Sequence, residues 1–415
     1  MSRKTNFVLL LLFVSLFNSF IFAQMFGQEP TERVRTYDVR HITIDISLDL
    51  LKKTVSGKTV TTIVPLNNSF TSFEVDAVGM EIKSVRKVQY VSQSMKDLFG
   101  EPKPKYLTYS YDKNKLTINL DREYSTFDSI TYIVDYLTTD PEKGMYFISP
   151  SETFPKKPYQ VWTQGEGEDN RYWFPCYDYP NDMAATEIYV TVDKKYQTLS
   201  NGLVKEKKEN GDGTVTWHWV QELPHVSYLV MLGVGNWDVI EDSWSGIPIS
   251  SYVPPGKMEW GRRSYRNTTD VLKFFSEYTG FTYPWGKFSQ VAVEDFIYGG
   301  MENTGAVVLF DGSCYDEKTE PDYNATNLVA HELAHMWWGD AVTCSNWNEI
   351  WLNESFATYF QCLYTEHLLG KDEFDYNIYR NGRDAVKADS TVRKPIYTRE
   401  GLTTNTYDKG SVVLN

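Results

Sequence analysis

Apolar and polar residues alternate along several segments in the first half of the chain. The clearest run covers residues 42–50, where Ile or Leu takes every second position and Thr, Asp or Ser stands between them. Shorter alternating runs cover residues 116–120, 130–136 and 188–192. A period of two is that of a strand with one buried face. Because turn residues separate these runs, the pattern predicts an all-β saddle or sandwich.

The pattern changes after Pro254-Pro255-Gly256. Apolar residues within 271–275 have helical spacing and stop before Gly280, which suits a helix C-cap. Helical patterns dominate from there to the last residue. We therefore expect an N-terminal β domain over residues 24–247 and a second, mainly helical domain over residues 248–415.

The amino terminus has the pattern of a secretory signal peptide. Arg3 and Lys4 precede an apolar run over residues 7–17, and the small residue Ala23 follows. The run is about 11 residues long, shorter than the roughly 20 residues of a membrane-spanning helix. We expect residues 1–23 to be the signal peptide. Cleavage after it would export the protein to the periplasm or the extracellular space, without a stable membrane span.

Composition excludes several classes of protein. Apolar residues make up 41% of the 415 residues and charged residues 23%, which is typical of a globular chain rather than a disordered or fibrous one. The 41 Lys and Arg against 55 Asp and Glu give a net charge of -14. An acidic chain lacks the electrostatic footprint of a nucleic-acid-binding protein, so we expect no nucleic-acid partner.

The cysteines do not indicate a disulfide-based fold. There are four of them, too few for a disulfide scaffold in a chain of this length, and no C-x-x-C pair suggests a metal knuckle. Their disulfide state stays open, because Cys344 and Cys362 could pair in an oxidising compartment.

The motif with the clearest chemistry is His331-Glu332-Leu333-Ala334-His335. On a helix, His331 and His335 lie one turn apart on the same face. That spacing suits two nitrogen ligands of one Zn²⁺ at roughly 2.0–2.1 Å. Glu332 sits about 100° round the helix, where it can reach a water at the metal without being a ligand. The motif therefore predicts a zinc site with a glutamate base.

Glu354 is the predicted third ligand. It lies 354 - 335 = 19 positions after His335, in a helical pattern over residues 348–369 that ends at Gly370. Two antiparallel helices joined by a short connection can bring it over the two histidines. Two His and one Glu with an open fourth position form a catalytic rather than a structural zinc site. A metzincin is excluded because its third His would stand where the chain has Ala341.

The chain resembles the aminopeptidase N family of gluzincin zinc metallopeptidases from about Tyr37 to its last residue. Four features carry the resemblance: Thr163-Gln164-Gly165-Glu166 followed by Phe174-Pro175-Cys176-Tyr177-Asp178, Gly299-Gly300-Met301-Glu302-Asn303, the His331–His335 motif with Glu354, and Tyr407-Asp408-Lys409-Gly410. Since all four occur in the family's order, the match is specific.

The resemblance implies that the second domain is a thermolysin-like α+β catalytic domain with one Zn²⁺ per chain, which removes single residues from peptides with a free amino terminus. It also implies that Glu332 is the general base and that Tyr407 donates a hydrogen bond to the oxyanion. The implied substrate-binding residues are Glu302, Glu166 and Gln164 for the α-ammonium, Gly299, Gly300 and Met301 for an edge strand along the substrate, and Tyr298 for the first side-chain pocket.

One departure from the family concerns the carboxyl end. Family members continue well beyond the Tyr-x-Lys-Gly segment, whereas this sequence ends at Asn415, so we expect the catalytic domain to be incomplete. The leading hypothesis is an exported zinc-dependent aminopeptidase. One alternative is an epoxide hydrolase on the same scaffold, which needs a basic carboxylate-binding site outside this sequence. The other is a non-catalytic, peptide-binding fragment, which loss of a zinc ligand or of Glu332 would favour.

Overall fold

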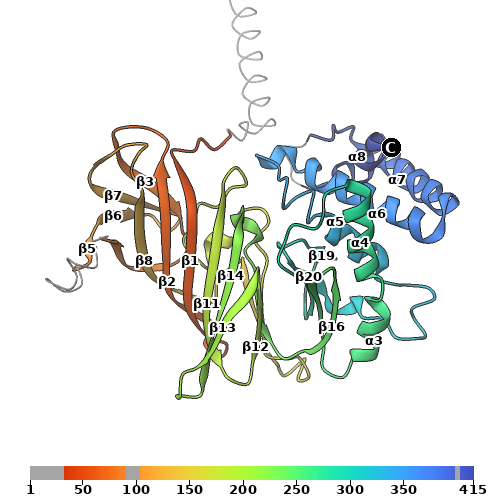
Figure 1. The fold of residues 1–415 in the computed structure, drawn as a ribbon, viewed down its shortest axis with the longest axis horizontal. Helices are drawn as coiled ribbons and strands as arrows, with labels where there is room; N and C mark the ends of the chain where they lie inside the picture. Colours follow the sequence, from red (N-terminus) through yellow and green to blue (C-terminus); the bar gives the residue numbers. More distant parts are fainter. Residues whose placement is uncertain (1–31, 90–102, 398–401) are drawn as a thin grey trace, which may run out of the picture.

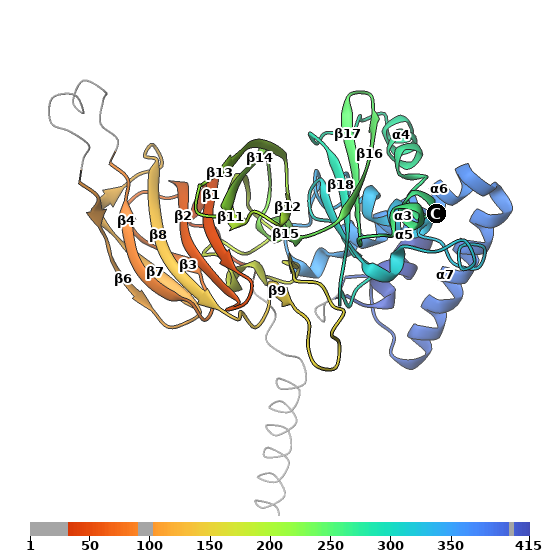
Figure 2. The same ribbon diagram turned by 90° about the horizontal axis from the view of Figure 1, so that it is seen from below.

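The computed structural model describes residues 32–89, 103–397 and 402–415, so the predicted signal peptide, residues 1–23, lies outside the described residues. A β-rich part and a mixed α/β part lie side by side along the long axis (Figures 1 and 2). The predicted fold class, a β domain followed by an α+β domain, is confirmed.

The largest sheet of the first part has eight strands. In spatial order they are β13 (Leu203–Glu209), β14 (Thr214–Val226), β11 (Met183–Asp193), β1 (Tyr37–Asp49), β2 (Thr54–Pro65), β8 (Ile130–Thr139), β4 (Glu81–Lys87) and β5 (Lys105–Tyr106). The alternating run at residues 42–50 lies mainly in β1, where Ile42, Ile44 and Ile46 are buried on one face. β1 pairs antiparallel with β2 and parallel with β11, so it lies in the interior of the sheet.

Two smaller sheets complete the β part. One contains β3 (Phe70–Asp76), β7 (Lys115–Tyr124) and β6 (Thr108–Tyr111). The other contains β12 (Gln197–Ser200), β15 (Leu232–Gly235), β10 (Gln160–Thr163) and β9 (Met145–Ile148). All four residues of β10 are buried, and the chain leaves this strand directly into the segment that carries Gln164 and Glu166.

The second part is built on a five-stranded mixed sheet. Its strands, in spatial order, are β16 (Asp238–Trp244), β17 (Ile247–Val253), β18 (Phe288–Val293), β20 (Ala306–Phe310) and β19 (Gly300–Met301). Its helices are α3 (Met258–Ser264), α4 (Thr268–Thr279), α5 (Thr326–Ala334), α6 (Trp351–Leu369), α7 (Lys371–Thr391), the π-helix η5 (Asn405–Lys409) and α8 (Gly410–Leu414). Short 3₁₀ helices are η1 (Asn170–Tyr172), η2 (Ser227–Leu229), η3 (Asp311–Ser313) and η4 (Trp347–Glu349).

Two predicted helix ends agree with the structure. Gly280 caps α4 with φ +68, a left-handed conformation that glycine adopts without steric cost. The helix that carries Glu354 ends at Leu369, and Gly370 follows. The predicted boundary between residues 247 and 248 falls at the start of β17, which pairs with β16. By strand pairing the second sheet therefore begins at Asp238, ten residues (248 - 238) before the predicted start of the second domain.

The two parts share a buried interface. Trp162 of β10 donates its indole N–H to the carbonyl of Glu294 at 2.9 Å, and Trp237 donates to the carbonyl of Ala292 at 3.2 Å. Val291 and Val308, from two strands of the second sheet, belong to the same apolar core as the β part. This packing holds the loops of the β part at a defined distance from the second sheet.

The cysteines are buried free thiols: Cys176, Cys314, Cys344 and Cys362. The pairing of Cys344 with Cys362 that the sequence left open is therefore absent. Cys362 instead packs against Asn381, whose amide lies 3.8 Å from its sulfur. Among the described residues, no helix combines the length and apolar character needed to cross a bilayer.

Lys287 is a buried cation at the interface. It is 7% exposed, its ammonium donates to the carbonyl of Gly305 at 2.8 Å, and it lies 5.5 Å from the ring centroid of Trp219 in β14. Burial lowers the pKa of Lys287 to about 7. Since the unfolded chain holds this proton up to the ordinary lysine pKa of about 10.4, the free energy of unfolding should rise as pH increases from about 7 toward 10.

We predict that Lys287→Met raises the free energy of unfolding at pH 7, because it removes a buried charge and keeps an apolar stem of similar length. The advantage of the variant should shrink by about 1 kcal/mol per pH unit above pH 7. Denaturant unfolding at several pH values checks this. Lys273→Met, at an exposed position of α4, is the matched control, and a difference at Lys287 that did not change with pH would contradict the prediction.

Candidate active site

Two packed helices bring together the predicted metal ligands. α5 carries His331 and Glu332, and His335 is its C-cap residue. Apolar residues of α5 such as Val329 and Leu333 lie in the apolar core between the helices and the sheet of the second part. This packing fixes the rotation of the helix and turns both histidines toward α6. Glu354 lies in the first turn of α6, where it is 3% exposed.

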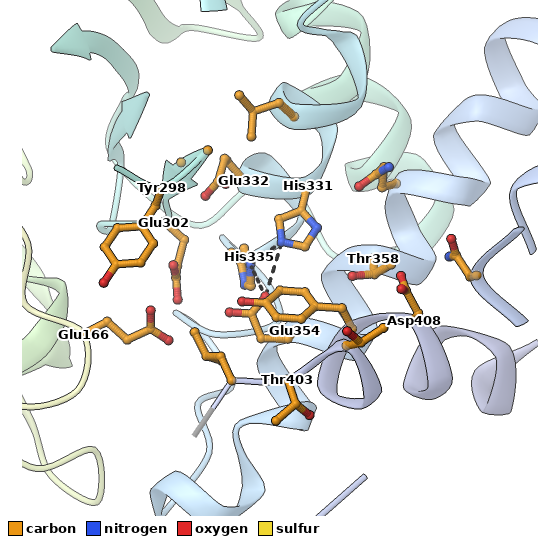
Figure 3. A pocket seen from close by; sticks show the side chains of 18 of the residues that line it. Glu166, Tyr298, Glu302, His331, Glu332, His335, Glu354, Thr358, Thr403 and Asp408 are labelled. Carbon is orange, nitrogen blue, oxygen red and sulfur yellow. Dashed lines mark hydrogen bonds and ion pairs between the residues drawn. The ribbon is translucent and has the colours of Figure 1, made fainter. Parts of the chain in front are cut away.

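The three ligand atoms form a tight triangle. The Nε2 atoms of His331 and His335 are 3.2 Å apart, and Glu354 Oε2 lies 3.3 Å from the first and 3.5 Å from the second. Ligands of a tetrahedral Zn²⁺ with bonds of roughly 2.0–2.1 Å stand about 3.3 Å apart. Figure 3 shows the three side chains converging from the two helices.

The surroundings of the triangle also fit a metal ion. Nδ1 of His335 lies 3.0 Å from the carbonyl oxygen of Trp338, which can only accept, so in the neutral ring Nδ1 carries the proton and Nε2 presents a lone pair. This lone pair faces a second imidazole nitrogen and a buried carboxylate oxygen. Three electron pairs directed at one buried point require a cation between them. Two imidazoles and one carboxylate are the donor set of a catalytic zinc site.

Glu332 lies beside the triangle, against the edge strand β19. A Cβ atom on Gly300 would stand 2.2 Å from Glu332 Oε1, so only glycine leaves room for this carboxylate. β19 pairs with β20 through Gly300 and Met301, and its other edge is the end of the sheet. Burial raises the pKa of Glu332 well above its usual range. A carboxylate that can hold a proton, Glu332, therefore lies beside the open edge of β19.

Further carboxylates face the predicted metal ligands from two parts of the chain. Oxygens of Glu166, Glu302 and Glu354 all lie within 4.8 Å of one another. Glu166 comes from the β part, and in Figure 3 its carboxylate points toward Glu302 and the metal-binding group. Burial, together with the charges of Glu302 and Glu354, raises the pKa of Glu166 well above its usual range. Oε1 of Glu302, which is 3% exposed, has no hydrogen-bond partner among the described residues.

Such a cluster of buried carboxylates favours a positively charged partner, because each carboxylate raises the cost of ionising the others. Gln164 lies at the same place, 6% exposed, and its Oε1 also lacks a hydrogen-bond partner among the described residues. These oxygens can accept the three hydrogen bonds of an ammonium group.

Tyr407 reaches the site through a tight helix contact. A Cβ atom on Gly410 would stand 1.6 Å from Ser355 Oγ, and this hydroxyl donates to the carbonyl of Thr406 at 2.7 Å. η5 and α8 are thereby held against the first turns of α6, and the ring centroid of Tyr407 lies 6.1 Å from that of His331. Burial raises the pKa of Tyr407, so its hydroxyl stays protonated and can donate a hydrogen bond.

All but one of the predicted residues line one cavity of about 660 Å³. Tyr298 is 52% exposed at its rim. The exception is Met301, whose side chain lies in the core and whose backbone pairs with Val308. The cavity also contains lining residues that sequence analysis did not identify: Leu328, Thr358, Gln361, Arg380, Asn381, Leu402, Thr403, Thr404 and Asp408. Apart from Asp408, which follows Tyr407 in the motif quoted above, they belong to no motif, and only the packing of α5, α6 and α7 with the segment around η5 turns them toward the cavity.

Comparison with known proteins gives matches over most of the chain. The family description "Peptidase M1 N-terminal domain" matches residues 35–229, and "Peptidase family M1 domain" matches residues 263–415. The chain is 33% identical over 274 residues to a leucyl aminopeptidase of Saccharolobus solfataricus, a match that covers 62% of this chain and 34% of that protein. It is 37% identical over 235 residues to aminopeptidase M1 of Arabidopsis thaliana, covering 55% of this chain and 26% of that protein.

The chain thus spans about a third or less of the length of these curated relatives. Among solved structures, it is similar to a mutant of an M1 zinc metallopeptidase from Deinococcus radiodurans bound to a Tyr-Ser-Ala substrate. The TM-score is 0.73 at 19% identity, and the match covers 92% of this chain and 82% of that one. At this identity the similarity shows a common fold.

We predict that the purified protein binds about one zinc per chain and that His335→Ala abolishes this binding, because two remaining ligands hold zinc poorly. Metal analysis after dialysis checks the stoichiometry. His367→Ala is the matched control, since His367 is a helical histidine with a partly exposed side chain, paired with Asp270. Stoichiometric zinc in His335→Ala would rule out the proposed ligand set.

Proposed function

The chain belongs to peptidase family M1, and on that basis we propose that it supplies the metal site of a zinc-dependent aminopeptidase that removes the amino-terminal residue from peptides. The observation that carries the proposal is the position of Glu166 and Glu302, whose carboxylate oxygens lie within 4.8 Å of each other and of the metal-binding Glu354. Because an ammonium group held there stands beside the metal, only the first peptide bond of a substrate is within reach.

His331, His335 and Glu354 would hold the zinc ion, which when bound polarises the scissile carbonyl and acidifies water. Glu332 accepts the proton of the attacking water and passes it to the leaving nitrogen. The hydroxyl of Tyr407 donates to the oxygen that becomes negatively charged. Since all of these groups lie in one cavity, we prefer a catalytic role to that of a non-catalytic peptide-binding scaffold.

The substrate backbone is proposed to lie along β19. This strand pairs on one side with β20 through Gly300↔Leu309 and Met301↔Val308, and its other side borders the cavity. An extended peptide can add to such an edge through main-chain hydrogen bonds, which do not depend on side-chain identity. The side chain of the substrate's first residue then points toward the rim of the cavity near Tyr298. In this arrangement, recognition of a substrate rests on its free amine and its backbone.

We also propose that the protein is exported. The supporting observation is the basic, apolar and small-residue pattern of residues 1–23. The mature chain is expected to begin at Gln24, and amino-terminal sequencing of the exported protein checks this. Recovery of the protein from the cell interior with its first 23 residues intact would contradict export by this signal.

We predict that Glu332→Gln keeps about one zinc per chain and lowers kcat by about 10²–10⁴-fold, because the amide has no basic oxygen to accept the proton of water. Hydrolysis of a panel of aminoacyl chromogenic substrates by the full-length protein, with zinc measured in parallel, checks this. The wild-type protein should lose activity with a chelator and regain it with zinc. Turnover near the wild-type rate in Glu332→Gln would remove this residue from the mechanism.

We predict that Glu302→Gln lowers kcat/KM for substrates with a free amine by about 10–100-fold, because a hydrogen bond to a charged group contributes about 1.5–3 kcal/mol. The wild-type enzyme should cut N-acetylated peptides poorly, and Glu302→Gln should not make them worse. Steady-state kinetics with matched free and acetylated peptides measures both effects. Equal cleavage of the two peptides by the wild type would overturn the amine anchor and the exopeptidase assignment together.

A further inference from the structure

One side chain outside the cavity joins the amine-binding segment to the metal-binding segment. Glu168 follows Glu166 by two residues in the β part, and its Oε1 accepts a hydrogen bond from the indole N–H of Trp347 at 3.0 Å. Trp347 begins η4, 354 - 347 = 7 residues before the metal ligand Glu354. The contact spans the interface between two segments that are 347 - 168 = 179 residues apart in sequence.

The backbone at this point is strained. Gly167 has φ +81 and Glu168 has φ +78, so two successive residues occupy the left-handed region. Glycine adopts that region freely, whereas a residue with a Cβ atom does so at a cost in free energy. Strain of this kind persists where surrounding contacts over-determine the conformation, and it concentrates at functional sites. The contacts of the Glu168 side chain must therefore offset the cost of its left-handed backbone, a cost that a glycine at this position would not have.

The carboxylate of Glu168 is itself held in place. Its Oε2 pairs with the guanidinium of Arg171. Arg171 is anchored in turn on Asp178, whose carboxylate accepts from the Arg171 backbone N–H at 3.0 Å and whose carbonyl accepts from Nη2 at 2.7 Å. A carboxylate with both oxygens engaged is a rigid acceptor for the indole of Trp347.

A second contact keeps Trp347 in register with α6. Its ring meets that of Tyr228 at 5.1 Å between centroids, in an edge-on arrangement. The hydroxyl of Tyr228 accepts from Asn353 Nδ2 at 2.9 Å, and Asn353 is the residue before Glu354. On the other side, the carbonyl of Tyr228 would stand 2.3 Å from a Cβ atom on Gly165, so the amine-binding loop lies directly on this segment.

We propose that the Glu168–Trp347 hydrogen bond is a positioning contact that sets the separation between the amine-binding carboxylate of Glu166 and the metal ligand Glu354. It thereby sets the space available for one substrate residue between the carboxylates that bind the amine and the metal site. Neither residue lines the cavity, so neither is a catalytic residue. The inference rests on the proposed function, because it assumes that Glu166 holds the substrate amine.

The test compares two metal-binding inhibitors that differ only in the amine: leucine hydroxamate and its des-amino counterpart, 4-methylpentanohydroxamate. We divide the inhibition constant of the des-amino inhibitor by that of leucine hydroxamate, both measured on the full-length, zinc-loaded protein. This ratio measures how much the amine adds to binding at the metal. Trp347→Phe removes the N–H donor and keeps a ring against Tyr228. We expect this variant to have a ratio about tenfold lower than that of the wild type, with unchanged zinc content and unchanged affinity for the des-amino inhibitor.

Two further variants separate positioning from a general loss of stability. Glu168→Gly removes the same hydrogen bond and also the pair with Arg171, while it relieves the left-handed strain, so it should lower the ratio with little change in the melting temperature. Combined with Trp347→Phe it should lower the ratio no further, because the contact that the two changes share is the Glu168–Trp347 hydrogen bond. Trp351→Phe is the matched control, since its indole donates locally to Glu349 at 2.7 Å, and the ratio should stay unchanged.

Glu166→Gln distinguishes failure of this proposal from failure of the proposed function. If Glu166→Gln lowers the ratio while Trp347→Phe and Glu168→Gly leave it unchanged, the positioning contact is refuted and the amine anchor stands. If Glu166→Gln itself leaves the ratio unchanged, the amine anchor is refuted and the positioning proposal falls with it. Equal weakening of both inhibitors by Trp347→Phe would assign the contact to stability alone and overturn the proposal.

Discussion

The repulsion among carboxylates buried in one cavity is the constraint on which the rest of the site depends. Glu166, Glu302 and Glu354 place oxygens within 4.8 Å of one another, and Glu332 lies beside them. Burial and the neighbouring charges raise the pKa of Glu166, Glu302 and Glu332. This cluster is stable in its charged form only with cations, and the proposed metal ion on one side and the proposed substrate ammonium on the other would meet that need.

The scaffold holds these charges together by close packing at a few points. Glycine at position 300 leaves space for Glu332, and glycine at position 410 lets η5 and α8 approach Ser355 closely enough to bring Tyr407 to the site. The β part contributes Glu166 through a loop that leaves the buried strand β10. Small residues occur where backbones must meet, and the interface between the two parts then converts local packing into fixed distances between functional groups.

The same physical logic explains which features could be predicted from the sequence. Alternation marked the strands of the β part, and helical spacing placed both histidines of the metal motif on one face, because both patterns depend only on local geometry. Glu354 followed from a second helix with a clear end at Gly370. Glu166, by contrast, lies in an acidic run that alone resembles a solvated loop, and only the family resemblance singled it out. Gln361 and Arg380 line the cavity without any sequence signal.

The sequence by itself determined the order of a β domain and a mainly helical domain, together with the predicted donor set of a metal site and the predicted base next to it, since these follow from short-range periodicity and motif spacing. Only the tertiary structure decided that Glu166 and Glu302, which are 302 - 166 = 136 residues apart, face the same cavity. It also decided that Glu168 meets Trp347 across the interface. The reason is that long-range distances arise from the packing of whole sheets and helices against one another, a property that no local pattern of residues encodes.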